Sequence, residues 1–407
     1  MMVKPNPFSI LIAAAMVVGC SDPGGIVTGS PFVTVLVDHE FNVDYGAGFT
    51  TPTVIPGASG RLDVVYGDFE QGTVKQAACT SSCSDSASWA AVVIDPNGHD
   101  PSATRTASGL HAVYLRDSTF PTQPLRYASC AGACPPGSSW SGAAVDSTSY
   151  AVSPALAADP AGGLHVVYGD NAGKRVRYAE CLANCLASAS WASTDLGQLQ
   201  APLAVNSGEK QTAIAAAGGT IHVVYAAHLD GVVRYLSCAA ACTNPASWQE
   251  ETIDSGQTFG TVSLALDAAG VLRLAYIAGP PRPAPNNGER WTVRYAACAT
   301  SCTTPIGWTH GDLTTDAAWT GDQGVALSTD ASGTLHLAYL LSQDATTSWS
   351  RDVAYAVCTV ACADSTHWLR TLVGRSGAQA VGLAVNASNE PGLTEVASGS
   401  FWFTALK

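Results

Sequence analysis

The chain has 407 residues, of which 47% are apolar and only 13% are charged. This composition provides enough apolar surface for a folded core and excludes extensive disorder. The formal net charge is -13, and the sequence contains no run of Lys and Arg that could follow a phosphate backbone. Nucleic acid is therefore not an expected partner.

The N-terminus has the pattern of an export signal. Lys4 precedes an apolar run over residues 8–18, which is too short to span a bilayer. The run ends in Val17-Val18-Gly19-Cys20, which resembles the lipobox of bacterial lipoproteins. Ser21 after this cysteine resembles the pattern for delivery to the outer membrane, on its periplasmic or its cell-surface face.

The lipobox resemblance implies a division of the chain. Residues 1–19 would be a signal peptide that is removed, Cys20 would carry the lipid, and residues 20–30 would be a flexible tether. Residues 31–407 would form the one folded domain, in contact with the membrane only through its lipid anchor. The alternative is an ordinary signal peptide with an incidental cysteine.

A cysteine and tryptophan pattern repeats six times. Each C-x3-C pair is followed six residues later by a tryptophan, and the repeats are 51 to 60 residues apart. This period is typical of a propeller blade or a similar unit. The six sets are Cys79, Cys83, Trp89; Cys130, Cys134, Trp140; Cys181, Cys185, Trp191; Cys238, Cys242, Trp248; Cys298, Cys302, Trp308; and Cys358, Cys362, Trp368.

Each repeat also predicts four antiparallel strands. A phrase such as Leu164-His165-Val166-Val167-Tyr168 precedes every cysteine pair and is typical of a strand buried on both faces. Before it lies another apolar run, joined through an Asp-to-Gly turn such as residues 159–162. A third strand leads to the cysteine turn, and a fourth begins at the tryptophan. The sequence therefore predicts an all-β propeller.

The chain ends predict the number of blades. Residues 381–406 contain three strands but no cysteine turn, whereas Phe32 to Asp38 matches the fourth strand of the other repeats. Pairing these two segments gives a seventh blade and closes the ring, which removes exposed sheet edges. The prediction is a seven-bladed propeller with six full repeats and one blade shared by the termini. The alternative is a six-bladed ring with loose ends.

Local disulfides are the simplest interpretation of the six pairs. An exported chain folds in an oxidising compartment, and twelve cysteines pair while Cys20 is lipidated. The competing interpretation is zinc binding, but no His or third Cys recurs beside a pair. Neither a metal nor another cofactor is expected.

The architecture resembles the sialidase-like propellers with Asp-box (BNR) repeats. In that family a Ser-x-Asp-x-Gly-x-Thr-Trp turn joins the third and fourth strands, and here the Trp recurs in that place. The box itself is absent, since Ser82, Ser84 and Ser86 occupy its positions before Trp89. The resemblance implies that the disulfide pins the hairpin in place of the box, and it does not extend to active-site residues.

No catalytic constellation is evident. The arginine triad and the Phe/Tyr-Arg-Ile-Pro segment of sialidases are missing from the first blade, where only Arg61 is found. The His of the recurring phrase invites comparison with polysaccharide lyases, but its repetition favours a structural contact between blades. The same interpretation applies to the recurring Arg-Tyr pairs, such as Arg177-Tyr178. An enzyme is therefore the less favoured hypothesis.

Function is expected where the repeats differ, on the loops of one face. Three tryptophans stand outside the repeat and map to the long loops of blades 5 and 6, together with polar residues. Aromatic rings flanked by hydrogen-bonding groups suit a sugar. The candidate binding residues are Trp291, Trp319, Trp349, Arg290, Arg351, Asp322, Asp344 and Glu289. The structural alternative is that these tryptophans anchor their own loops.

The sequence thus favours an exported, lipid-anchored propeller that binds a carbohydrate or a partner protein without catalysis. The alternative is a polysaccharide-degrading enzyme, either a glycoside hydrolase or a lyase, of the sialidase-like propeller type. The sequence predicts neither the identity of the ligand nor the oligomeric state.

Overall fold

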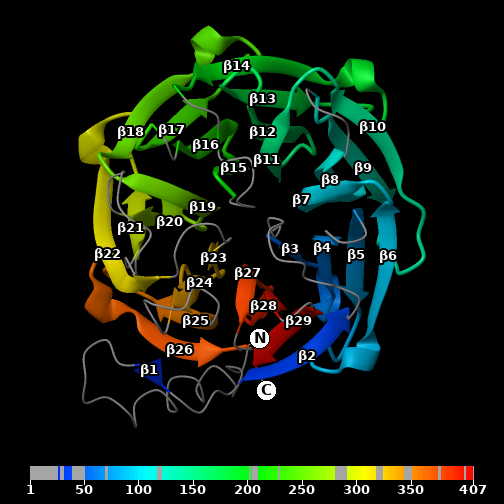
Figure 1. The fold of residues 1–407 in the computed structure, drawn as a ribbon, viewed down its shortest axis with the longest axis vertical. Helices are drawn as coiled ribbons and strands as arrows, with labels where there is room; N and C mark the ends of the chain where they lie inside the picture. Colours follow the sequence, from blue (N-terminus) through cyan, green and yellow to red (C-terminus); the bar gives the residue numbers. More distant parts are fainter. Residues whose placement is uncertain are drawn as a thin grey trace, which may run out of the picture.

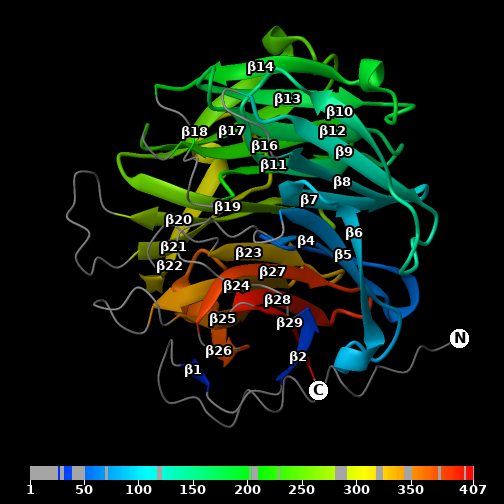
Figure 2. The ribbon, with the colours of Figure 1, turned by 45° about the vertical axis from the view of Figure 1, so that its right-hand side comes forward.

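The computed structural model describes residues 26–27, 32–38, 51–68, 72–116, 122–200, 203, 210–227, 230–279, 291–317, 324–342, 351–374, 377–397 and 400–406. Within them the chain forms strands and short 3-10 helices. Seven four-stranded antiparallel sheets surround a central axis, as blades of one ring (Figure 1). The oblique view shows the same sheets tilted against one another (Figure 2). The predicted seven-bladed propeller is confirmed.

Each blade runs from an innermost first strand to an outermost fourth strand. Blades 1 to 3 are β3 (Thr53–Pro56), β4 (Leu62–Asp68), β5 (Thr73–Cys79), β6 (Trp89–Asp95); β7 (Gly98–Thr106), β8 (Gly109–Arg116), β9 (Leu125–Ala131), β10 (Ser141–Asp146); and β11 (Ala151–Ala158), β12 (Leu164–Asp170), β13 (Arg175–Cys181), β14 (Ala192–Gln198). Blades 4 and 5 are β15 (Thr212–Ala217), β16 (Thr220–Ala227), β17 (Val232–Cys238), β18 (Gln249–Ser255); and β19 (Thr258–Leu266), β20 (Leu272–Gly279), β21 (Trp291–Cys298), β22 (Trp308–Ala317). Blades 6 and 7 are β23 (Val325–Thr329), β24 (Leu335–Ser342), β25 (Arg351–Cys358), β26 (Leu369–Val373); and β27 (Ala378–Val385), β28 (Pro391–Ala397), β29 (Ser400–Leu406), β2 (Phe32–Asp38).

The strand order divides the ring into two faces. The turns between first and second strands and the cysteine turns between third and fourth strands lie on one side, which we call the cysteine face. The links between second and third strands and between blades lie on the other side, which we call the loop face. The recurring Leu-His-x-x-Tyr phrase forms the second strand, and Val166 and Val167 of β12 are fully buried between neighbouring blades.

The N-terminal strand closes the ring as predicted. β2 pairs antiparallel with β29, from Phe32 opposite Leu406 to Asp38 opposite Phe401, and so provides the outermost strand of blade 7. The six-bladed alternative is therefore wrong.

A second N-terminal strand departs from the expected tether. β1 (Ile26–Val27) pairs in parallel with β26, with Ile26 opposite Arg370 and Val27 opposite Thr371. These two residues belong to the segment 20–30 that the sequence predicts to be flexible. The reason for the difference is that β26 has a free outer edge, which offers backbone hydrogen bonds to an extended segment.

The six predicted disulfides are present, each joining cysteines four residues apart. In five turns the indole nitrogen of the tryptophan donates to the carbonyl of the second cysteine, as from Trp191 to Cys185 at 2.9 Å. Blade 2 differs, since Trp140 donates instead to Gln76 Oε1 of blade 1 at 3.2 Å. Its turn contains Pro135 and Pro136 where the other blades have different residues.

The cysteine turns also cover the outer edges of neighbouring blades. The 3-10 helix Ser188–Ser190 of blade 3 packs on β10 of blade 2, where the amide of Ala144 donates to Ser188 Oγ at 3.1 Å. Equivalent helices pack on β14, β18, β22 and β2. Blade 7 is split between the termini and has no cysteine turn, so that β26 of blade 6 is covered by β1 instead (Figure 1).

The predicted Asp-to-Gly turn joins the first two strands of blade 3. Asp159 opens the first hairpin of blade 3, where its Oδ1 accepts the amides of Ala161 and Gly163 at 2.8 Å each. Gly162 closes this turn with a φ of 91°, a value that glycine adopts without strain.

Across the described residues, no helix has the length and apolar character needed to cross a bilayer.

Removing β2 should destabilise the whole ring. A chain that begins at residue 41 loses the partner of β29 and with it the closure of blade 7, so that its melting temperature should fall by more than 10 °C. A chain that begins at residue 28 keeps β2 and loses only β1, and it should melt within a few degrees of the full domain. Thermal denaturation followed by circular dichroism compares the two. Equal melting temperatures for the two chains would contradict the importance of this closure.

Candidate functional site

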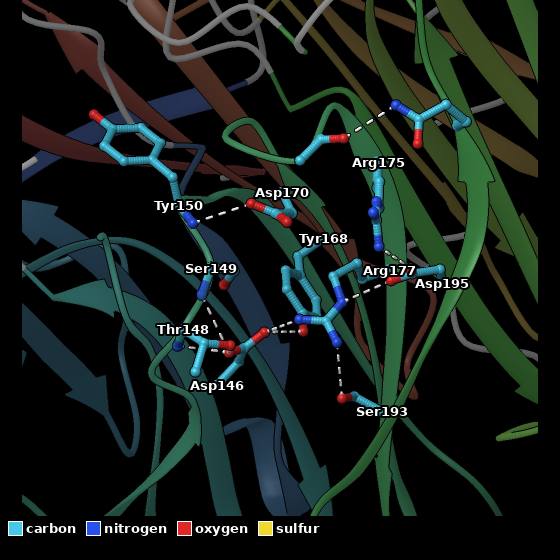
Figure 3. Close-up of polar contacts among 12 residues, drawn as sticks. Asp146, Thr148, Ser149, Tyr150, Tyr168, Asp170, Arg175, Arg177, Ser193 and Asp195 are labelled. Atoms are coloured by element: carbon cyan, nitrogen blue, oxygen red, sulfur yellow. Dashed lines mark hydrogen bonds and ion pairs between the residues drawn. The ribbon is translucent and has the colours of Figure 1, made fainter. Parts of the chain in front are cut away.

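A polar cluster joins blades 2 and 3 on the loop face (Figure 3). Asp146 ends the outermost strand of blade 2, and Tyr168 of blade 3 donates its hydroxyl to Asp146 Oδ2 at 2.7 Å. Arg177 of β13 forms an ion pair with the same carboxylate and a second one with Asp195 Oδ1 at 3.1 Å. The recurring arginine of the repeat thus joins its own blade to the preceding one.

The cluster keeps Asp146 charged. Burial disfavours the carboxylate, but the amide and hydroxyl of Thr148 and the hydroxyl of Tyr168 donate to it, and Arg177 lies beside it. Together these partners hold the pKa of Asp146 below its ordinary value. Burial and the neighbouring Asp146 raise the pKa of Tyr168. Neither group is therefore placed to exchange a proton near neutral pH.

The same contact recurs at other junctions between blades. Tyr66 donates to Asp38 at 2.8 Å, and Tyr114 donates to Asp95 at 2.7 Å. At the junction of blades 4 and 5, Asp254 accepts hydrogen bonds from the Tyr276 hydroxyl at 2.8 Å and from Arg294 at 2.7 Å. The remaining three junctions lack this aspartate. The residue at its position is Gly197 between blades 3 and 4, Thr314 between blades 5 and 6, and Gly374 between blades 6 and 7.

The recurring histidine makes a contact of a different kind from the one expected. His165 Nδ1 and the hydroxyl of Tyr178 are hydrogen-bonded at 2.7 Å, and both belong to blade 3. The expected contact between blades is made instead by the tyrosine, whose ring packs on Trp248 of blade 4 with a centroid distance of 5.1 Å. At the equivalent position of blade 2, burial lowers the pKa of His111 to about 4, so that this imidazole is neutral at neutral pH.

Of the predicted binding residues, only Trp291 has a described side chain. It is 3% exposed and belongs to the core between blades 5 and 6, whereas the sequence hypothesis expected a partly exposed ring. The physical reason is Gly279 on the neighbouring strand, where an added Cβ would lie 2.3 Å from the indole ring. Trp291 therefore supports the base of its loop.

The other predicted binding residues have no described side chain. Arg351 is the first residue of β25, and only its backbone is described. Cys20 and the remaining candidates lie outside the described residues; these candidates are Trp319, Trp349, Arg290, Asp322, Asp344 and Glu289.

The loops of blades 5 and 6 that contain the predicted binding residues begin and end at strands that lie side by side. Trp291 of β21 is paired with Ala317 of β22, and Ala317 is also paired with Leu341 of β24 in blade 6. Ser342 in turn is paired with Arg351 of β25. This bridge makes one continuous edge on the loop face, from which three loops of blades 5 and 6 leave.

Lys210 is a candidate functional residue that the sequence pattern does not reveal. It precedes β15, the innermost strand of blade 4, and its carbonyl accepts the amide of Val262 from blade 5 at 2.9 Å. Burial lowers the pKa of its ammonium group to about 8. Such a lysine can change protonation near neutral pH. Residue 210 lies outside the repeated phrases, so that nothing in the repeat points to it.

Across the described residues, no group of three or more His, Cys, Asp or Glu side chains is arranged to hold a metal ion.

No family model and no curated protein matches the chain, so the Asp-box resemblance stays a prediction. Solved structures share its fold. An α-L-arabinanase of Penicillium chrysogenum, complexed with arabinobiose, has a TM-score of 0.53 at 9% identity over 92% of this chain and 97% of that chain. A GH93 α-L-arabinofuranosidase of Fusarium graminearum with arabinobiose has a TM-score of 0.51 at 11% identity, over 92% and 98%.

A fungal alcohol oxidase of the AA5 family, in complex with copper, also shares the fold. Its TM-score is 0.55 at 11% identity, over 90% of this chain and 76% of that chain. At these identities the likeness shows the fold alone, and folds of this kind carry different chemistries.

Replacing Asp146 should test the cluster. Asp146→Asn should lower the free energy of unfolding by about 3 kcal/mol, because it breaks a buried ion pair. Asp195→Asn is the matched control, since this carboxylate is 41% exposed and should contribute less than about 1 kcal/mol. Urea denaturation of both variants measures the difference.

The effect of Asp146→Asn should depend on pH in a defined direction. The pKa of Asp146 is lowered in the folded protein, so its stabilising contribution is complete above the unfolded value of about 4. The contribution is lost as the pH falls through the lowered folded value. The stabilities of the parent and the variant should therefore converge in acid, and a constant difference down to low pH would contradict this account.

Proposed function

We propose that this protein is an exported propeller, anchored through a lipid on Cys20, that binds carbohydrate on the loop face of blades 5 and 6 without catalysis. The observation that carries the proposal is the departure of this junction from the repeat. Thr314 and Ala354 stand where the junctions of blades 1 and 2, 2 and 3, and 4 and 5 have an Asp and an Arg. In their place the backbone bridge between Ala317 and Leu341 joins the two blades.

This bridge supports a shared site for the three loops. Neighbouring strands are about 5 Å apart, and two residues of chain span at most about 7 Å. Trp319 and Trp349 are each two residues from a strand end on the bridged edge, at Ala317 and Arg351. The proposed ligand contacts are these two tryptophans with Arg290, Arg351, Asp322, Asp344 and Glu289, above the buried Trp291.

Several features support binding and a carbohydrate ligand. The recurring His, Tyr and Arg side chains are engaged in contacts that hold the blades, such as His165 with Tyr178 and Arg177 with Asp146. Two of the propellers with the same fold are complexed with arabinobiose. An aromatic ring offers an apolar surface to the C–H face of a sugar, and charged side chains accept or donate to its hydroxyl groups.

Export is supported by the six disulfides, because such bonds persist in oxidising compartments. Lipidation of Cys20 and delivery to the outer membrane rest on the signal sequence. Mass spectrometry of the membrane-extracted protein tests this part, since the first residue should be an acylated cysteine.

Binding should depend on the two loop tryptophans and stability on the buried Trp291. Trp319→Ala and Trp349→Ala should each weaken binding by about 2 kcal/mol, or roughly 30-fold, with little change in melting temperature. Trp291→Ala should instead lower the free energy of unfolding by about 3 to 5 kcal/mol, because it empties a core position. A glycan array that includes arabino-oligosaccharides, with calorimetric melting of each variant, measures both effects.

The matched control is Tyr150→Ala, which removes an aromatic ring from the loop face at blades 2 and 3 (Figure 3). It should leave glycan binding unchanged. Unchanged binding by both the Trp319→Ala and the Trp349→Ala variants would overturn the proposed site. Release of reducing ends or unsaturated products from bound polysaccharide would instead favour the enzyme.

A further inference from the structure

The rim of the cysteine face carries little charge, although the chain has a net charge of -13. The six segments between the first cysteine and the tryptophan contain no Lys or Arg and only two acidic residues, Asp85 and Asp364. Both carboxylates cap the 3-10 helix that follows, at 3.0 Å from the amide of Ala87 and 2.9 Å from that of Thr366. Their charge is therefore partly satisfied within the turn.

The same rim exposes apolar side chains. Of the six large apolar residues that are exposed in the described part of the chain, five belong to the cysteine turns or follow them directly. Ile306 is 93% exposed and Val360 is 67% exposed, on blades 5 and 6. The other three are Leu182, Leu186 and Leu369. Exposed apolar groups gathered on one face indicate a surface that contacts something less polar than water.

The direction of β1 shows at which face of the ring this strand begins. β26 begins at Leu369, directly after the cysteine turn, and runs toward the loop face. β1 is parallel to β26, so Ile26 lies at the cysteine-face end of this pair. The strand β1 therefore begins at the cysteine-face end of blade 6, opposite Arg370 and beside the exposed Leu369.

The length of the segment limits the distance to the lipid. Cys20 precedes Ile26 by six residues, which span at most about 20 Å when fully extended. A lipid on Cys20 would hold the bilayer surface within this distance of the outer edge of blade 6. Leu369 of blade 6 lies beside this point, and Ile306 and Val360 expose their side chains on the cysteine turns of blades 5 and 6.

We infer that the cysteine face is a membrane-docking surface, with blades 5 and 6 nearest to the bilayer that holds the lipid of Cys20. This inference rests on the lipid anchor in the proposed function. The cysteine turns, which carry only Asp85 and Asp364, suit a phospholipid surface, because anionic headgroups repel a protein of net negative charge wherever its carboxylates face them. The inner turns of the same face carry Asp159, Asp267, Asp330 and Glu390, each hydrogen-bonded within its own turn. The loop face, with its candidate binding site, then points away from the membrane.

Photo-crosslinking of the lipidated full chain tests this orientation. A photoreactive amino acid is placed at Ile306 or at Val360, and at Ser147 as the matched control. Ser147 is exposed on the loop face, on the link between blades 2 and 3. The proteins are reconstituted in vesicles of phosphatidylethanolamine and phosphatidylglycerol, irradiated, and analysed by mass spectrometry for phospholipid adducts. The expected result is at least a tenfold higher adduct yield at Ile306 and Val360 than at Ser147.

The outcomes separate the orientation from the anchor. Equal yields, or a higher yield at Ser147, on protein that floats with the vesicles would overturn the docking surface and leave the anchor standing. Protein that does not float with the vesicles would overturn the anchor and the orientation together. The pair Ile306→Asp and Val360→Asp alters only exposed positions and should keep the melting temperature. A photoreactive amino acid placed beside Leu369 should lose its phospholipid adducts in this double variant. Unchanged adducts there would contradict the role of the Ile306 and Val360 side chains.

Discussion

The contact between neighbouring blades is the constraint on which this ring depends. A four-stranded blade has two apolar faces, and only the adjacent blades can cover them, so each junction must close for its neighbours to be stable. On the loop face an aspartate of one blade accepts a hydrogen bond from the tyrosine of the next blade and forms an ion pair with its basic residue, as Asp146 does with Tyr168 and Arg177. Asp38 of the N-terminal strand provides this group at the last junction, where Tyr66 and Lys75 bind it.

The disulfides act on the edges of the blades more than on the junctions. Each closes a ring of about five residues, for which the chain-entropy relation gives only about 2 kcal/mol. In blades 1, 3, 4, 5 and 6 they hold a turn whose 3-10 helix packs on the outer strand of the preceding blade, as Ser188–Ser190 does on β10. Ile26 and Val27 pair with the outer strand of blade 6, because the seventh blade is split between the chain ends and has no cysteine turn.

Repetition explains which features could be predicted from the sequence. The six cysteine and tryptophan sets, the strands around them and the match of Phe32 to Asp38 with a fourth strand were sufficient for the blade count and the closure. The burial of Trp291 could not be predicted, because it depends on Gly279 of the adjacent strand, and neither residue belongs to the repeat. The partners of the recurring histidine and arginine were also beyond reach, since periodicity identifies equivalent positions but not the side chains that they face.

The places where the repeat fails carry most of the information about function. At the junction of blades 5 and 6 the aspartate and the arginine are both replaced, yet Tyr339 remains buried and the core is continuous. Here the backbone bridge between Ala317 and Leu341 joins the two blades, and the buried Trp291 belongs to the core that they share. A junction held by backbone and core contacts needs no charged side chains for its own closure. The proposed binding site uses the charged and aromatic residues of its loops, on the face opposite to the cysteine turns.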